Sequence, residues 1–153
     1  MLKIGDKVNN FSCKDDSGNL INFSDYKGKK LVVFFYPKAD TPGCTAEACS
    51  LRDNYKEISS LGYAILGVSA DSEKKQKSFS DKFSFHFPLI ADEEKEVIDS
   101  FGVWGAKKFM GREYEGILRK TFIIDENGII KHIIDKVKTK EHAVQVLDAI
   151  KSL

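Results

Sequence analysis

An unbroken apolar segment, residues 31–36 (LVVFFY), constrains the fold of this 153-residue chain more than any other feature. It is rich in β-branched and aromatic side chains, which is typical of a strand covered on both faces of a sheet. Pro37 ends the strand. Thr41 and Pro42 then have the pattern of a helix start, with Thr41 as the N-cap and the proline at the first helical position. The segment therefore predicts a buried strand that leads into a helix.

A cysteine falls in the first turn of that predicted helix. It is Cys44, and Cys49 follows five residues later. Free backbone N–H groups and the positive end of the helix dipole favour an anion at such a position. The sequence therefore predicts that Cys44 is held as a thiolate, the reactive form of cysteine.

Periodic patterns predict the other elements and a mixed sheet. Strand and helix patterns alternate in the middle of the chain, as in β-α-β units, and later hairpins add antiparallel strands. We therefore expect an α/β fold with a mixed central sheet flanked by helices. The expected elements are hairpins at 10–13/20–23 and 121–124/129–134, strands at 63–69 and 87–91, helices at 73–83 and 93–101, one helix with an apolar stripe from Ala48 to Leu61, a long loop at 102–116, and a last helix capped by Thr139 with Ala143, Val146, Leu147 and Ile150 on one face.

Composition excludes several classes of protein. Lys plus Arg number 24 against 23 Asp plus Glu, and the charges are interspersed, so no basic footprint of a nucleic-acid binder is present. No apolar stretch has the length of a membrane span or a signal peptide, which predicts no membrane partner and a cytoplasmic location. The length fits a single domain, residues 1–153.

Cysteine and histidine usage favours thiol chemistry without a metal. Three cysteines are too few for a disulfide-dense secreted scaffold. Cys13, in a predicted strand, is expected to be an unreactive core or edge thiol. His86, His132 and His142 are scattered, and no spacing resembles a zinc site. We therefore expect neither a metal nor another cofactor.

The residues around Cys44 resemble the peroxiredoxin pattern of proline, three residues, threonine, two residues, cysteine. Here these are Pro37, Thr41 and Cys44, with Glu47 after them. Residues 119–122 (RKTF) match the segment that supplies an active-site arginine in this family. The later segments 103–105 (VWG) and 107–111 (KKFMG) are similar to a loop of the peroxiredoxin Q group, also called bacterioferritin comigratory protein. The resemblance spans nearly the whole chain.

This resemblance implies a thioredoxin-like fold with an extra N-terminal β-hairpin. It also implies a thiol peroxidase that reduces hydrogen peroxide and organic hydroperoxides, with thioredoxin or a similar dithiol as reductant and no metal or haem. Cys49 stands where many members carry their second reactive cysteine. That position implies an atypical two-cysteine enzyme with an intrachain disulfide, for which we expect a monomer.

The chemistry assigns a role to each matched side chain. A thiolate must attack one peroxide oxygen while the other leaves, so the site must stabilise negative charge on sulfur and on oxygen. Arg119 could bring a fixed positive charge, and Thr41 a hydroxyl donor. Glu47 could orient the arginine, although a carboxylate near a thiolate opposes its formation. The predicted catalytic residues are Cys44, Cys49, Thr41, Pro37, Arg119 and Glu47, and Pro42 is expected to shield the pocket.

Helix geometry sets a condition on any bond between the two cysteines. Residues five apart in a regular helix are about 7.5 Å apart along the axis and roughly 140° around it, which places their Cα atoms about 8.6 Å apart. A disulfide needs Cα atoms within about 7 Å. Cys44 and Cys49 can therefore pair only if the first turns unwind. The same angles put Cys44 on the side of the helix that carries the apolar stripe and Cys49 nearly opposite it.

Two other classes remain open at this point. A disulfide oxidoreductase of the thioredoxin type is the nearest rival enzyme, but that chemistry uses two cysteines separated by two residues, and here four separate them. A redox-regulated binding or holdase module would be oxidised once without turnover. Sustained turnover of peroxide is expected of a peroxidase and would distinguish it from both alternatives.

Overall fold

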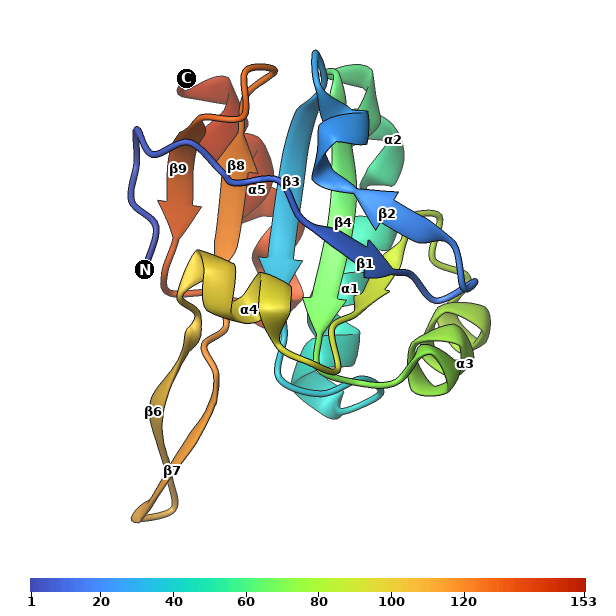
Figure 1. Ribbon diagram of the computed structural model, residues 1–153, viewed down its shortest axis with the longest axis vertical. Helices are drawn as coiled ribbons and strands as arrows, with labels where there is room; N and C mark the ends of the chain where they lie inside the picture. The colour runs from blue at the N-terminus through green and yellow to red at the C-terminus, as the bar shows by residue number, and fades with distance from the viewer.

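The computed structural model describes residues 1–153 and places a five-stranded mixed sheet at the centre of the molecule (Figure 1). The strand order is β5–β4–β3–β8–β9. Strands β3 (Lys30–Phe35), β4 (Tyr63–Ser69) and β5 (Leu89–Ala91) are parallel, whereas β8 (Thr121–Ile124) and β9 (Ile130–Ile134) are antiparallel to their neighbours. The predicted α/β class and mixed sheet are confirmed.

Alternation along β3 divides the core into two layers. Val32 and Phe34 face one apolar cluster, and Leu31, Val33 and Phe35 face the other. All five side chains are fully buried, as expected for a central strand with both faces covered. The hydrophobic run at 31–36 is thus explained by packing on both sides of the sheet.

Helices cover both faces of the sheet. The cluster on the first face includes residues from four helices: α1 (Pro42–Asp53), α2 (Tyr55–Ser60), α3 (Glu73–Phe83) and α5 (His142–Lys151). The other face is covered by α4 (Glu96–Phe101) and the N-terminal segment. The N-terminal segment carries the predicted hairpin, β1 (Ser12–Lys14) with β2 (Leu20–Asn22), followed by the 3-10 helix η1 (Phe23–Tyr26), and Figure 1 shows this hairpin in front of the sheet. None of the helices is long and apolar enough to cross a membrane.

The predicted loop at 102–116 is wrong. Strands β6 (Trp104–Phe109) and β7 (Arg112–Ile117) form a separate antiparallel hairpin that projects from the body of the molecule (Figure 1). Met110 and Gly111 both have positive φ, as a tight two-residue hairpin turn requires. Most of the hairpin side chains are exposed, so no apolar alternation marks the strands. That is why the sequence pattern missed them.

The single helix expected up to Leu61 is also wrong, because Asn54 divides it into α1 and α2. The Asn54 side chain donates to the carbonyl of Ser50, an example of a short polar side chain that competes for helical backbone groups. Ile58 is buried whereas Leu61 is exposed, so the apolar stripe ends before Leu61.

The boundaries of two other helices differ from the prediction. Thr139 does not cap the last helix but begins the short 3-10 helix η2 (Thr139–Glu141), and α5 starts at His142. The apolar face predicted for α5 is buried. Helix α4 starts at Glu96, three residues later than expected, because Lys95 adopts a left-handed conformation.

The packing of β4 gives a test of the core. A Cβ atom on Gly67 would lie 2.8 Å from both Leu89 Cδ2 and Phe34 Cζ. Gly67→Ala should therefore lower the free energy of unfolding by about 1–3 kcal/mol, measured by urea denaturation. In the Phe34→Leu background the same change should cost less, since the clashing ring is gone; strictly additive effects would contradict this contact.

Candidate functional site

Sheet topology brings the reactive cysteine and the predicted arginine together. Strand β3 runs toward α1, and its antiparallel neighbour β8 starts at the same edge, with Phe34 opposite Thr121. Arg119 precedes β8 and therefore lies beside the start of α1. Its Nη2 donates to Cys44 Sγ at 3.3 Å. Two residues far apart in sequence thus form the contact that the family pattern implied.

The start of α1 is built as predicted, with one difference. Thr41 is the N-cap with extended backbone, Pro42 is the first helical residue, and Cys44 is buried in the first turn. The Thr41 hydroxyl, however, donates to the carbonyl of Lys38 at 2.8 Å and caps no N–H group. Pro42 is exposed. The Cys44 sulfur therefore sits where free backbone N–H groups favour an anion.

Glu47 holds the other side of the arginine. Its Oε1 accepts from Arg119 Nη1 at 2.6 Å, and the carboxyl group is fully buried. Burial raises the pKa of Glu47 to about 7, although Arg119 acts in the opposite direction. Glu47 thus contacts Arg119 from one turn after Cys44, and its orienting role stays a prediction.

His142 completes the group from the start of α5. Its Nε2 lies 2.7 Å from Thr121 Oγ1 and 3.4 Å from Glu47 Oε2, and its Nδ1 lies 3.0 Å from Gln145 Oε1. Burial lowers the pKa of His142 to about 4, and Arg119 acts in the same direction. Both effects favour the neutral form of the His142 imidazole.

Arg119 lies among groups of both charge signs. Burial alone would lower the pKa of Arg119, but the neighbouring Cys44 and Glu47 raise it above its ordinary value. Lys107 of β6 donates to the carbonyl of Ile117, and burial together with Arg119 lowers the Lys107 pKa. The site is therefore rich in positive charge close to Cys44.

A buried network fixes the loop before α1. Tyr36 donates to Gln76, whose amide donates to Ser69, and Ser69 in turn donates to Asp71. Asp71 Oδ2 also accepts from the backbone N–H of Ala39 at 2.7 Å. The loop between β3 and α1 is thereby tied to the end of β4.

The remaining predicted residues lie outside this contact group. Pro37 is half-buried at the start of the loop, where it ends β3. Cys49 lies on the same unbroken helix as Cys44, and both thiols are free. Cys49 is half-buried against the cluster that contains Cys44, so the expectation that it faces away from the apolar stripe is wrong. Burial raises the Cys49 pKa and raises that of Cys13 to about 11.

Sequence reasoning missed three contributors to the site. Gly43 allows the close approach of Arg119, because a Cβ atom there would lie 3.3 Å from Nη2. His142 and Lys107 reach the site from α5 and β6, which no local pattern could connect with Cys44. For Gly43 a signal existed, since glycine next to a reactive residue often permits close approach.

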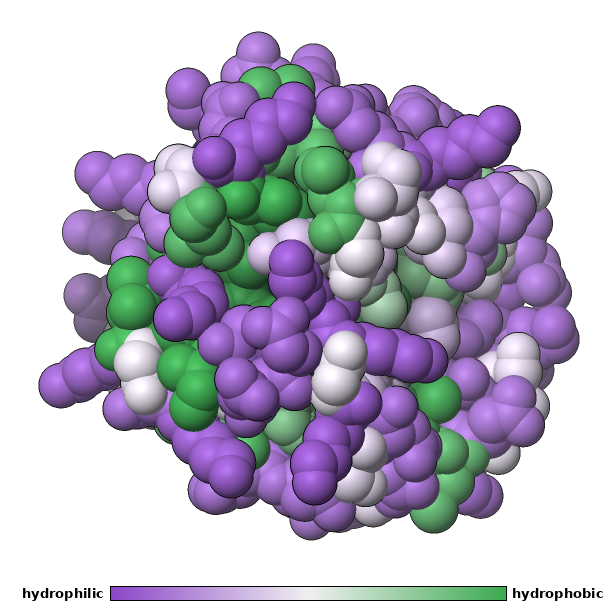
Figure 2. Space-filling view, turned by 90° about the horizontal axis from the view of Figure 1, so that it is seen from above, coloured by the Kyte–Doolittle hydropathy of each residue, from purple (hydrophilic) through white to green (hydrophobic).

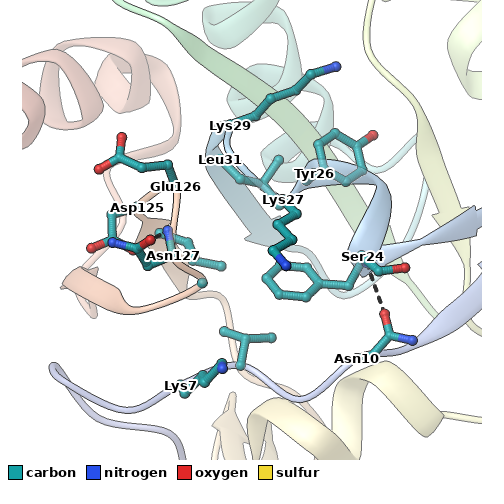
Figure 3. A pocket seen from close by; sticks show the side chains of 14 residues that line it. Lys7, Asn10, Ser24, Tyr26, Lys27, Lys29, Leu31, Asp125, Glu126 and Asn127 are labelled. Carbon is teal, nitrogen blue, oxygen red and sulfur yellow. Dashed lines mark hydrogen bonds between the residues drawn. The ribbon is translucent and has the colours of Figure 1, made fainter.

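A pocket of about 400 Å³ lies at the opposite end of the sheet, near the start of β3 (Figure 3). Its lining includes Lys7, Lys27 and Lys29 around the apolar Phe23 and Leu31. The face seen in Figure 2 is largely hydrophilic, with one group of hydrophobic side chains in a hollow and smaller hydrophobic groups toward the rim. Because β3 begins at Lys30 and leads to α1 only at its far end, this pocket is separate from Cys44.

No group of three or more His, Cys, Asp or Glu side chains is arranged to hold a metal ion.

Comparison with known proteins points to one family. The AhpC/TSA family model matches residues 4–133. Peroxiredoxin Bcp of Escherichia coli strain K12 is 45% identical over 150 residues, which cover 98% of this chain and 96% of that protein. Peroxiredoxin Bcp of Bacillus subtilis strain 168 is 42% identical over 152 residues, with coverages of 99% and 97%.

Solved structures give the same answer. A PrxQ mutant of Xylella fastidiosa is similar with a TM-score of 0.93 at 32% identity, covering 99% of this chain and 97% of its own. Peroxiredoxin Q of Xanthomonas campestris is similar with a TM-score of 0.87 at 35% identity, with coverages of 93% and 90%. The predicted thioredoxin-like fold is confirmed. The chain belongs to the AhpC/TSA family and, within it, to the peroxiredoxin Q group, also called bacterioferritin comigratory protein.

Proposed function

We propose that this thiol-dependent peroxidase uses Cys44 as its nucleophile, Cys49 as the thiol that resolves it, and a thioredoxin-like dithiol as reductant. One observation carries the proposal: Arg119 donates to Cys44 Sγ at 3.3 Å while Glu47 holds its other nitrogen at 2.6 Å. A bacterioferritin comigratory protein of Xanthomonas campestris, 35% identical to this chain, is described as having alkyl peroxide reduction activity. This description supports organic hydroperoxides as substrates, and the family resemblance adds hydrogen peroxide.

In the first step the Cys44 thiolate attacks one peroxide oxygen. A sulfur–oxygen bond forms, the oxygen–oxygen bond breaks, and the product is a Cys44 sulfenic acid. The other oxygen leaves as alkoxide or hydroxide and takes a proton from water. Arg119 lies within hydrogen-bond distance of the sulfur and supplies fixed positive charge where negative charge moves from sulfur to oxygen.

In the second step the Cys49 thiol attacks the sulfenic sulfur, and water leaves as the disulfide forms. Both cysteines lie on the continuous helix α1, so this step requires the first turns of α1 to unwind. Unwinding also removes the burial that raises the Cys49 pKa, which increases its reactivity. A reduced dithiol then restores both thiols and is itself oxidised.

Several features of the reduced helix support local rather than global unwinding. The second half of α1 is held by Arg52, which donates to the carbonyl of Phe83, and by Ser50, which accepts from Ala143 N–H. The first turns lack such side-chain links apart from the contacts of Cys44 and Glu47 with Arg119 and of Glu47 with His142. Because both thiols belong to one chain, we keep the prediction of a monomer. The predicted cytoplasmic location also stays a prediction.

The roles of the two cysteines can be separated by parallel peroxide turnover. Cys44→Ser should abolish turnover with thioredoxin, its reductase and NADPH. Cys49→Ser should still undergo one oxidation event per molecule but not turn over. Cys13→Ser is the matched control and should retain activity, because Cys13 donates to the Ala91 carbonyl away from Arg119. Turnover by Cys44→Ser would exclude the proposed nucleophile.

The contribution of Arg119 can be measured in a single turnover. Arg119→Met removes the positive charge next to Cys44 Sγ and should slow sulfenic acid formation by at least about tenfold, followed by stopped flow. Arg112→Met on the exposed strand β7 is the control and should react like wild type. Equal rates for the two variants would rule out the electrostatic role of Arg119.

The unwinding step is tested by changing helix propensity between the cysteines. Ala46→Gly should favour unwinding by about 1 kcal/mol and speed disulfide formation up to about fivefold. Lys74→Gly in α3 is the control and should leave this rate unchanged. If Ala46→Gly slowed the step, a wound helix would be the reactive form and the proposed mechanism would be wrong.

A further inference from the structure

One buried polar atom at the site lacks a partner. Glu47 Oε2 has neither solvent contact nor a hydrogen bond, and it faces His142 Nε2 at 3.4 Å with both side chains fully buried. A buried carboxylate oxygen without a donor is costly, and its neighbourhood therefore needs explanation.

Contacts with Gln145 fix the protonation of the imidazole on its far side. The Gln145 amide nitrogen donates to the Lys136 carbonyl, and its Oε1 accepts from Lys138 N–H, so the amide cannot be reversed without losing both bonds. Because Oε1 also faces His142 Nδ1 at 3.0 Å, Nδ1 must carry a proton. A neutral His142 then presents only a lone pair at Nε2.

That lone pair already has a donor. Thr121 Oγ1 lies 2.7 Å from Nε2 and can donate its hydroxyl proton there. A neutral imidazole therefore has no hydrogen to offer Glu47 Oε2, and two lone pairs would face each other if Glu47 were a carboxylate. One additional proton, on either the carboxyl group or the ring, removes this conflict.

We propose that Glu47 and His142 together hold one proton more than a carboxylate and a neutral imidazole would, which makes the pair uncharged and leaves the charge of Arg119 to the Cys44 thiolate. This inference rests on the proposed role of Cys44. It makes His142 a positioning residue that acts through Glu47 and Arg119.

Neighbouring charges indicate where the proton lies. The charged group that reaches the pair is Arg119, which precedes β8, and Cys44 of α1 and Lys107 of β6 lie beyond it, next to Arg119. Burial raises the pKa of Glu47 to about 7 and lowers that of His142 to about 4, with Arg119 opposing a second positive charge on the ring. The proton is therefore held mainly by Glu47.

The extra proton resolves the conflict expected between Glu47 and a thiolate. A charged Glu47 would leave the group formed with Arg119 and Cys44 at a net charge of −1 and would oppose ionisation of the sulfur. An uncharged Glu47 still accepts from Arg119 through Oε1 but no longer competes for its charge. Orientation of the arginine and stabilisation of the thiolate thus become compatible.

Counting protons by folding stability tests the proposal without peroxide. Between pH 4.5 and 6.5, the ordinary pKa values of the two groups, the unfolded chain carries one proton on this pair, held by the histidine. The proposed native pair also carries one proton, so folding neither binds nor releases a proton at this pair. In Glu47→Gln the native His142 is neutral, while the unfolded one binds a proton, and stability must rise with pH.

The measured quantity is the ratio of folding equilibrium constants, Glu47→Gln over wild type, from urea denaturation across this pH range. The proposal predicts that the ratio rises by up to about tenfold per pH unit. A pH-independent ratio would show that native Glu47 is an ordinary carboxylate and would overturn it. Glu57→Gln is the control, since Glu57 is exposed and pairs with Lys151, and its ratio should not rise.

Spectroscopy of the wild type keeps the test decisive if the Gln variant does not fold. A carboxylic acid band of Glu47 in the infrared at pH 6, or a His142 imidazolium with protons on both nitrogens by NMR, supports the proposal. Absence of both overturns it. Neither measurement involves peroxide, so an inert Cys44 would refute the proposed function alone.

Discussion

The contact of Arg119 with two residues of one helical turn determines the geometry of the site. Nη2 reaches Cys44 Sγ and Nη1 reaches Glu47 Oε1. Because the guanidinium is planar, these two contacts fix its orientation. This contact needs β8 to start where β3 ends, and it needs Gly43 without a side chain. The sheet therefore places a fixed positive charge against the start of α1 before any substrate binds.

Local signals in the sequence predicted the part of the site that lies in one segment. The buried strand, the N-cap and Cys44 in the first helical turn follow from residues 31–44 alone, and the bounds of β4 and α3 were predicted to the residue. The hairpin β6–β7 was missed because solvent reaches both its faces, so its strands show no alternation of apolar and polar residues. Contacts of His142 could not be predicted, since they arise only when α5 packs beside α1.

Wound and unwound forms of α1 serve opposite needs in the proposed cycle. The wound helix offers its N–H groups and Arg119 to Cys44, and it keeps Cys49 half-buried with a raised pKa. The unwound helix gives up those interactions but allows the two sulfurs to meet. Side-chain bonds from Ser50 and Arg52 anchor the far end of α1, which confines the change to the turns that carry both thiols.

In the proposed cycle Glu47 would couple this change to protons, because it lies on the turns that would unwind. In the wound helix its carboxyl group is buried beside His142 and has a pKa of about 7, whereas exposure would return it to its ordinary value of 4.5. Between pH 4.5 and about 7, unwinding therefore releases the proton held by Glu47, so a rising pH favours the unwound form. Glu47 would then act twice. Its uncharged form leaves the charge of Arg119 to the Cys44 thiolate, and its loss of a proton lowers the free energy needed to unwind the helix after the sulfur has reacted.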